Sequence, residues 1–291
     1  MKTVILLFVS LISIFWTNWI QKTEQPQLNT KNQVISCYNM ETPNAYQKEA
    51  STATFATLHE SPKHIVDYQQ IGQLIEFPTA DGNNAKAYFI QAPKKSNNWL
   101  IVIQEWWGLN DNIKYEADQY YKDLGNMNVL AVDMYDGKVA ATSDSAMKLM
   151  RGADMNRMVS IIQGAITKAG INANIYSVGW CFGGMWSLQT AILAGEKAKG
   201  TIMFYGRPES NLEKLKTLNC DIIGFFGNKD QSPSPAVVSA FEKNMQLANK
   251  KLETHKYEAG HGFANPSNPS FNAEAAADAY KKAITFLKTR S

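Results

Sequence analysis

Gly179-Trp180-Cys181-Phe182-Gly183-Gly184 lies between an apolar run and a segment of helical pattern. Small residues two positions before and two positions after a central nucleophile are typical of a sharp strand–turn–helix elbow. Glycines at these places let the chain turn tightly without steric clash. We therefore expect the Cys181 thiol to stand above the edge of a sheet, at the positive end of a helix, where the thiolate is favoured over the thiol.

Short apolar runs alternate with helix-length segments on both sides of this elbow. Strands are predicted at Leu74–Phe77, Ala85–Ile90, Trp99–Ile103, Val129–Val132, Ile175–Gly179, Thr201–Tyr205, Ile222–Phe226 and Leu252–Tyr257. Helices are predicted at Ile113–Leu124, Ser143–Arg151, Met155–Lys168, Gly184–Ala194, Val237–Asn249 and Ala273–Lys288.

This alternation predicts a mostly parallel sheet with right-handed crossovers. A turn signal at Asp81-Gly82-Asn83-Asn84 makes the first two strands a hairpin. The order predicts an α/β fold of the α/β-hydrolase type, with an eight-stranded sheet flanked by helices and no large cap domain.

Asp230 and His261 each follow a later predicted strand. A thiol that acts as a hydrolytic nucleophile needs a base and a group that orients the base. Nucleophile, acid and base occur in that chain order in α/β-hydrolases, and ligand sites in open α/β sheets lie at the carboxyl ends of the strands. Each of these residues alone is ordinary in a structural role, so the predicted triad of Cys181, Asp230 and His261 depends on their shared placement.

The other histidines fit the role of base less well. His59 and His64 lie in a polar segment or at its margin, and His255 lies inside a predicted strand.

Glu105 is a further candidate for the active site. It lies between Gln104 and Trp106 at the end of another predicted strand. Its neighbours predict partial desolvation, so the ionised carboxylate needs a partner, either the thiol or a nearby donor. The alternative is a glutamate that caps a backbone group.

Residues from about 65 to 290 resemble the dienelactone hydrolase family of α/β-hydrolases. Cysteine in the elbow together with Gln-Glu at an earlier strand end is the most specific part of the resemblance. The matching stretches are Gln104-Glu105-Trp106-Trp107-Gly108, Asp133-Met134-Tyr135, Gly179-Trp180-Cys181-Phe182-Gly183-Gly184, Gly227-Asn228-Lys229-Asp230 and His261-Gly262-Phe263-Ala264.

The resemblance implies that Cys181 is the nucleophile, His261 the base and Asp230 the residue that orients it. Glu105 matches the family glutamate that pairs with the resting thiol and helps to convert it to thiolate when substrate binds. The implied reaction is hydrolysis of an ester or lactone through an acyl-thioester, with no metal or organic cofactor.

The resemblance also implies that the backbone N–H groups of Trp106 and Phe182 form the oxyanion hole. The family's prototype holds its substrate carboxylate with two arginines, and Asn265 and Ser143 stand at the matching places. An amide and a hydroxyl bind a carboxylate less strongly than the guanidinium group of arginine does. We therefore expect a less anionic substrate. The candidate substrate-binding residues are Trp107, Tyr135, Trp180, Phe263 and Asn265.

Within residues 1–20 the only charged side chain is Lys2, which precedes an apolar stretch, and the next charge is Lys22. This pattern predicts either a cleaved signal peptide or a retained membrane anchor, and an exported protein that is periplasmic or faces outside the cytoplasm. Residues 21–64 are polar and predict a linker or arm, before the hydrolase-like domain at 65–291. Lipidation of Cys37, or its pairing with Cys220, stays open.

The chain has 291 residues and a net charge of +3, with no block of Lys and Arg, which argues against nucleic acid as a partner. No metal-ligand spacing is present. The predicted partner is a small-molecule ester or lactone. The alternative function is a non-catalytic ligand-binding protein of the cell envelope that keeps the fold.

Overall fold

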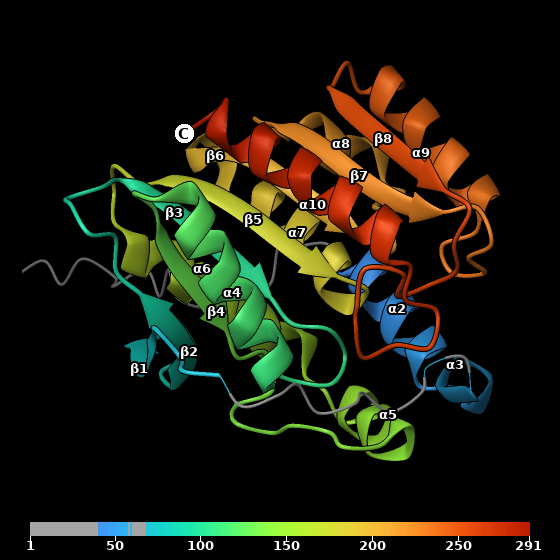
Figure 1. Cartoon of the computed structure of the whole chain (residues 1–291), viewed down its shortest axis with the longest axis horizontal. Helices are drawn as coiled ribbons and strands as arrows, with labels where there is room; N and C mark the ends of the chain where they lie inside the picture. Colours follow the sequence, from blue (N-terminus) through green and yellow to red (C-terminus); the bar gives the residue numbers. More distant parts are fainter. Residues whose placement is uncertain (1–39, 58, 60–67) are drawn as a thin grey trace, which may run out of the picture.

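A computed structural model describes residues 40–57, 59 and 68–291 (Figure 1). The predicted signal or anchor, residues 1–20, and Cys37 lie outside this range. Among the described residues, no helix has both the length and the apolar character to cross a membrane.

A single eight-stranded sheet runs through the molecule in the order β1-β2-β4-β3-β5-β6-β7-β8. Its strands are β1 (Gln73–Pro78), β2 (Asn84–Ile90), β3 (Asn98–Ile103), β4 (Asn128–Val132), β5 (Asn174–Trp180), β6 (Ala198–Phe204), β7 (Asp221–Gly227) and β8 (Leu252–Tyr257). Strand β2 is antiparallel to β1 and β4, and every other pairing is parallel. The predicted α/β-hydrolase fold is confirmed.

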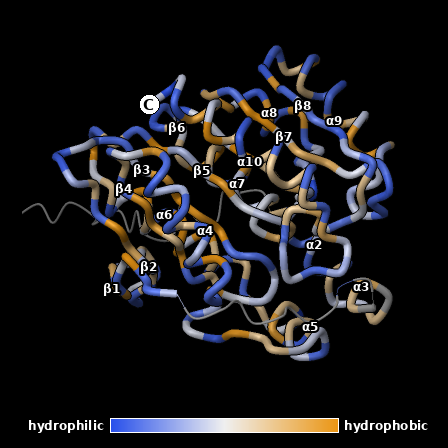
Figure 2. The backbone as a smooth tube through the Cα atoms, viewed as in Figure 1, coloured by the Kyte–Doolittle hydropathy of each residue, from blue (hydrophilic) through white to orange (hydrophobic). Residues whose placement is uncertain are grey.

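Helices cover both faces of this sheet. They are α4 (Asp111–Leu124), α5 (Ser143–Arg151), α6 (Met155–Ala169), α7 (Phe182–Ala194), α8 (Leu212–Lys216), α9 (Pro235–Leu247) and α10 (Ala273–Lys288), with a 3-10 turn at Gly195–Lys197. Helices α4 and α10 lie side by side on one face, and α6 and α7 lie together behind the sheet (Figure 1). Because both faces are covered, β4 is buried along its whole length and hydrophobic colour follows the central strands (Figure 2).

The strand register brings distant residues to one edge. Ile103 of β3 pairs with Gly179 of β5, so Glu105 and Cys181, each two residues farther on, leave the sheet at the same level. Gly227 of β7 pairs with Tyr257 of β8, which carries the following loops, with Asp230 and His261, to the same edge.

Two short helices occupy part of the segment that the sequence analysis assigned to a polar linker or arm. They are α2 (Glu41–Ala50) and α3 (Ala53–Thr57), and they pack against α5, with α2 also against α7. We call this segment, with His59, the α2–α3 cover. Its composition is polar because its outer face is exposed, but Tyr46 and Phe55 are 3% exposed and point into the core.

Polar bonds hold the α2–α3 cover in place. Gln47 Nε2 donates to the carbonyl oxygens of Met150 (2.9 Å) and Ala153 (2.7 Å). Thr42 donates to buried Glu209 at 2.5 Å, and Arg207 pairs with Glu49. These bonds reach both α5 and the loop after β6, so the cover is fastened on two sides.

Candidate active site

Cys181 occupies the elbow between β5 and α7, as the sequence predicts. Its backbone lies at φ 55° and ψ −116°, a strained conformation for a residue with a side chain. The turn requires glycine at its neighbours, because a Cβ on Gly179 would lie 2.1 Å from the carbonyl oxygen of Gly183 and one on Gly183 would lie 2.2 Å from that of Ile103. Helix α7 begins at Phe182, so its first N–H groups, including that of Phe182, have no intrahelical partner.

His261 and Asp230 form a tight pair beside this elbow. His261 Nδ1 lies 2.8 Å from Asp230 Oδ2, and Asp230 is 4% exposed. A carboxylate at Nδ1 favours the tautomer with hydrogen there and leaves Nε2 as the reactive nitrogen. Among the described residues Nε2 has no hydrogen-bond partner. Burial alone lowers the pKa of His261, but Cys181 and Asp230 outweigh it and raise that pKa well above its usual range.

The α2–α3 cover lies directly over the thiol. The Tyr46 hydroxyl is 3.2 Å from Cys181 Sγ, and His59 Nε2 is 3.9 Å from it. Cys181 is 2% exposed as a result. Burial and the thiol raise the pKa of Tyr46 well above its usual range, so this hydroxyl keeps its proton and can donate it to a thiolate.

Aromatic stacking fixes His59 in this position. Its ring stacks on Phe55 at 3.9 Å between centroids and meets the His261 ring at 4.8 Å. His59 Nδ1 bonds to the Phe55 carbonyl oxygen at 2.7 Å. Burial, with His261 close by, lowers the pKa of His59 to about 3, so its ring is neutral near neutral pH. The sequence pattern points to neither His59 nor Tyr46, because neither residue follows a predicted strand.

Glu105 lies at the same edge, but its partners are not the thiol. Asn265 Nδ2 donates to Oε2 at 2.6 Å and the Tyr205 hydroxyl lies 3.4 Å from Oε1. Burial raises the pKa of Glu105, although nearby His261 and these donors oppose the rise. Of the two partners considered from sequence, a nearby donor is the one that the structure supplies.

The residues predicted to bind substrate lie in different surroundings. Asn265 is engaged with Glu105, and Phe263 is fully buried between Tyr205 and Tyr257. Trp107 is buried edge-on to Trp106. Each of these three side chains packs against or bonds to another side chain of the site, and their role in substrate binding stays a prediction.

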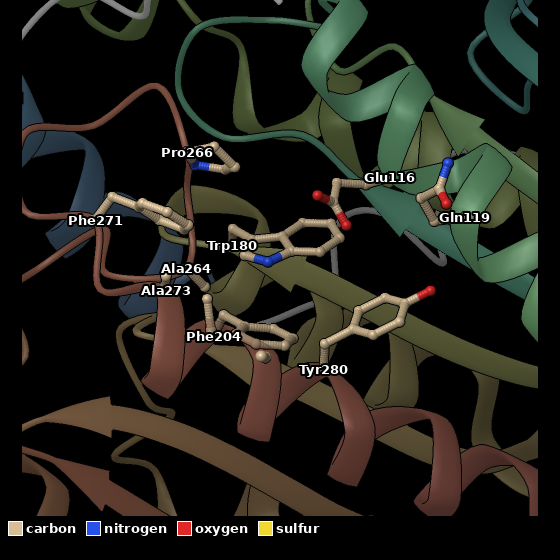
Figure 3. Close-up of a pocket in the computed structure, with 11 residues that line it drawn as sticks. Glu116, Gln119, Trp180, Phe204, Ala264, Pro266, Phe271, Ala273 and Tyr280 are labelled. Carbon is tan, nitrogen blue, oxygen red and sulfur yellow. The ribbon is translucent and has the colours of Figure 1, made fainter.

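Tyr135 lies near the thiol of Cys181, and Trp180 lines a cavity. Tyr135 is buried against Phe182, and its hydroxyl has no partner among the described residues. Trp180 lines a cavity of about 290 Å³ between α4 and α10, with Phe204, Glu116 and Tyr280 (Figure 3). Burial, with Glu105 nearby, raises the pKa of Glu116 to about 7.

A second, smaller cavity continues from this one to Glu105. Trp180, Glu116, Ala264 and Pro266 line both cavities, and Glu105 and Asn265 line only the smaller one. Together the two cavities lead from the space between α4 and α10 to Glu105, at the edge of the sheet that carries Cys181. Its walls are mostly apolar, and its charged groups are carboxyl groups.

A model of the dienelactone hydrolase family matches residues 86–291. The chain belongs to the dienelactone hydrolase family. It is accordingly a hydrolase that acts on ester or lactone bonds, which favours the enzymatic hypothesis over the ligand-binding alternative.

A curated relative agrees with this assignment, and two solved structures share the fold. The carboxymethylenebutenolidase of Pseudomonas putida is 27% identical over 237 residues, covering 73% of this chain and 94% of that protein. A dienelactone hydrolase-like promiscuous phosphotriesterase from metagenomic libraries superposes with a TM-score of 0.62 at 18% identity, over 76% of this chain and 99% of its own. An esterase from Pyrococcus furiosus gives 0.59 at 12% identity, over 80% and 97%. At these identities the two structures show the shared fold.

Proposed function

We propose that this protein is a cysteine-dependent hydrolase of carboxylic esters or lactones that works through an acyl-thioester. The observation that carries the proposal is the pair formed by His261 and Asp230 at 2.8 Å, with a ligand atom of His261 within 4.8 Å of Cys181 Sγ. A buried base, oriented by a carboxylate and next to a thiol in an elbow, has the geometry of an activated nucleophile.

In the proposed reaction His261 Nε2 takes the proton of Cys181, and the thiolate attacks the carbonyl carbon of the substrate. The carbonyl electrons move to oxygen, and the N–H groups of Trp106 and Phe182 stabilise this oxyanion, each by about 3 kcal/mol. The intermediate collapses, and the leaving alcohol takes the proton from His261. Water, deprotonated by His261, then attacks the thioester, releases the acid and returns the thiol.

A substrate with little negative charge suits the surroundings of the site. Each of the four arginines is engaged elsewhere, because Arg157 binds Asp81 and Asp136, Arg290 binds Asp221, Arg207 pairs with Glu49 and Arg151 donates to the Ser51 carbonyl. Ser143 donates to the His59 carbonyl oxygen. The described lining residues of the two cavities that lead to the site include Glu105 and Glu116 but no basic side chain that could pair with a substrate carboxylate. We propose a neutral ester or lactone with an apolar group.

A panel of neutral and anionic aryl esters and lactones tests this function on three proteins: wild type, Cys181→Ala and Cys220→Ala. Cys220 is a matched control because it is the other described cysteine and no disulfide joins it to Cys181. We expect at least about a 1,000-fold loss of turnover for Cys181→Ala, none for Cys220→Ala, and faster cleavage of the neutral substrates. Equal turnover in wild type and Cys181→Ala would contradict the mechanism.

Export of the protein is a separate proposal, which rests on the apolar stretch of residues 1–20. Cleavage within or shortly after that stretch leaves the α2–α3 cover in the mature chain, because α2 starts at Glu41. The mass of the protein purified from the envelope and from the cytoplasmic fraction distinguishes a cleaved signal from a retained anchor. Full-length protein in the soluble cytoplasmic fraction would exclude both.

A further inference from the structure

Three ligand-type side chains meet at the buried elbow. His59, Cys181 and His261 each present a ligand atom, and these atoms lie within 4.8 Å of one another. They come from the α2–α3 cover, from the elbow after β5 and from the loop after β8. Sequence spacing contains no sign of this cluster, because its members are 122 and 80 residues apart (181 − 59 and 261 − 181).

Both imidazoles are oriented as metal ligands usually are. A metal-binding histidine donates its second ring N–H to a carboxylate or a backbone carbonyl, which fixes the tautomer and raises the basicity of the ligating nitrogen. His261 Nδ1 bonds to Asp230, and His59 Nδ1 bonds to the Phe55 carbonyl oxygen. Both Nε2 atoms are therefore the ligating positions: His59 Nε2 carries a free lone pair, and His261 Nε2 offers its lone pair when the metal displaces its proton. His59 Nε2 is the atom that faces the thiol, and His261 Nε2 is buried without a described partner.

The distances are close to those of a tetrahedral ion. Bonds of about 2.3 Å to sulfur and about 2.0 Å to nitrogen place the ligand atoms about 3.5 Å apart around Zn²⁺. His59 Nε2 is 3.9 Å from Cys181 Sγ and all three ligand atoms lie within 4.8 Å of one another, so the side chains must move together by about 0.5–1 Å to supply three of the four ligands, and a water supplies the fourth. A thiolate with two imidazoles is a donor set that suits zinc and excludes magnesium and calcium, which prefer oxygen ligands.

The surroundings favour a cation once the thiol has lost its proton. The Tyr46 hydroxyl, 3.2 Å from Sγ, can donate to the metal-bound thiolate. The carboxylate of Asp230 lies behind one ligand, and none of the four arginines is directed at the cluster. Buried charges are stable only when paired in this way.

We propose that His59, Cys181 and His261 form a binding site for a zinc-type divalent cation. The metal replaces the thiol proton and uses the lone pair of His261. Bound metal therefore holds the nucleophile and the base together, and the hydrolase is inhibited while the site is filled. Metal binding is independent of the proposed function, whereas the inhibition rests on it.

Cobalt(II) serves as a spectroscopic probe of the full-length protein under anaerobic conditions. We expect one equivalent to give a near-ultraviolet thiolate-to-cobalt charge-transfer band and the visible bands of a tetrahedral ion, and zinc to abolish both. His59→Ala should weaken zinc binding at least about 10-fold, and His59→Gln, which keeps the size of the side chain, should weaken it too. His255→Ala is the matched control, because His255 lies in β8 and stacks on Phe225, away from the cluster.

Two results would overturn the site. One is an octahedral cobalt spectrum without a charge-transfer band, and the other is equal zinc affinity in wild type, His59→Ala and His59→Gln with native circular dichroism. Ester turnover measured with added zinc separates the two proposals. Cobalt bands without turnover in metal-free protein would sink the proposed function alone, and Cys181-dependent turnover without cobalt bands would sink the metal site alone.

Discussion

Two regions of the molecule meet at the Cys181 thiol and reach it in different ways. One is the set of loops after β5, β7 and β8, and the other is the α2–α3 cover. Cys181, Asp230 and His261 arrive there because parallel strands end at one edge of the sheet. Tyr46 and His59 arrive there because an amphipathic segment docks over that edge. The sheet edge therefore holds the proposed chemistry, while the cover controls how the thiol is screened, since Cys181 is 2% exposed.

Among the residues on the loops that follow the strands, Asp230→Asn is expected to have the largest effect. The amide keeps the shape of the side chain but no longer holds the required tautomer of His261, so we expect kcat/KM for an ester to fall about 1,000- to 10,000-fold. Asp144→Asn, at an exposed position in the first turn of α5, is the control. A loss of less than about threefold in Asp230→Asn would contradict the role of Asp230 in orienting His261.

Gly183→Ala tests the elbow itself. The added Cβ would meet the Ile103 carbonyl oxygen at 2.2 Å, so the helix must shift or the turn must open. We expect the free energy of unfolding, measured with urea, to fall by about 2–4 kcal/mol. Gly152→Ala is the matched control, because its Cβ meets nothing closer than 3.5 Å. Equal stability of the two variants would contradict the close approach.

Glu116→Gln tests the cavity beside the sheet edge through its pH dependence. Because the pKa of Glu116 is raised to about 7, the folded state holds a proton that the unfolded state loses above about pH 4.5. The free energy of unfolding of the wild type therefore falls as pH rises from about 4.5 to 7. We expect the stability of the variant relative to wild type to increase by about 1–3 kcal/mol over that window. Exposed Glu213→Gln should show no such change.

Tyr46→Phe tests the α2–α3 cover with the smallest change. The ring still packs against Phe55 and Phe182, but the hydroxyl that can donate to a thiolate is lost. A hydrogen bond to a charged group contributes about 1.5 kcal/mol or more, so we expect alkylation of Cys181 by iodoacetamide at pH 7 to slow about 10-fold. Faster alkylation would mean that Tyr46 only shields the thiol.

Much of the fold was predictable because it depends on local pattern. The eight strands and the helices at Ser143–Arg151 and Ala273–Lys288 follow from apolar runs and end signals that neighbouring residues supply. Helices α2 and α3 were missed, because their few buried residues lie within a polar segment and gain their stability from contacts with α5 and α7.

By itself the sequence determined which residues end the strands of this sheet, and hence that a thiol, a carboxylate and an imidazole share one edge, because parallel strands impose that arrangement on whatever follows them. Only the tertiary structure decided the rest. It paired Glu105 with Asn265 and placed Phe263 in the core. It also laid Tyr46 and His59 over the sulfur of Cys181. These contacts join segments with no fixed spacing along the chain, and their geometry arises from packing rather than from any local pattern.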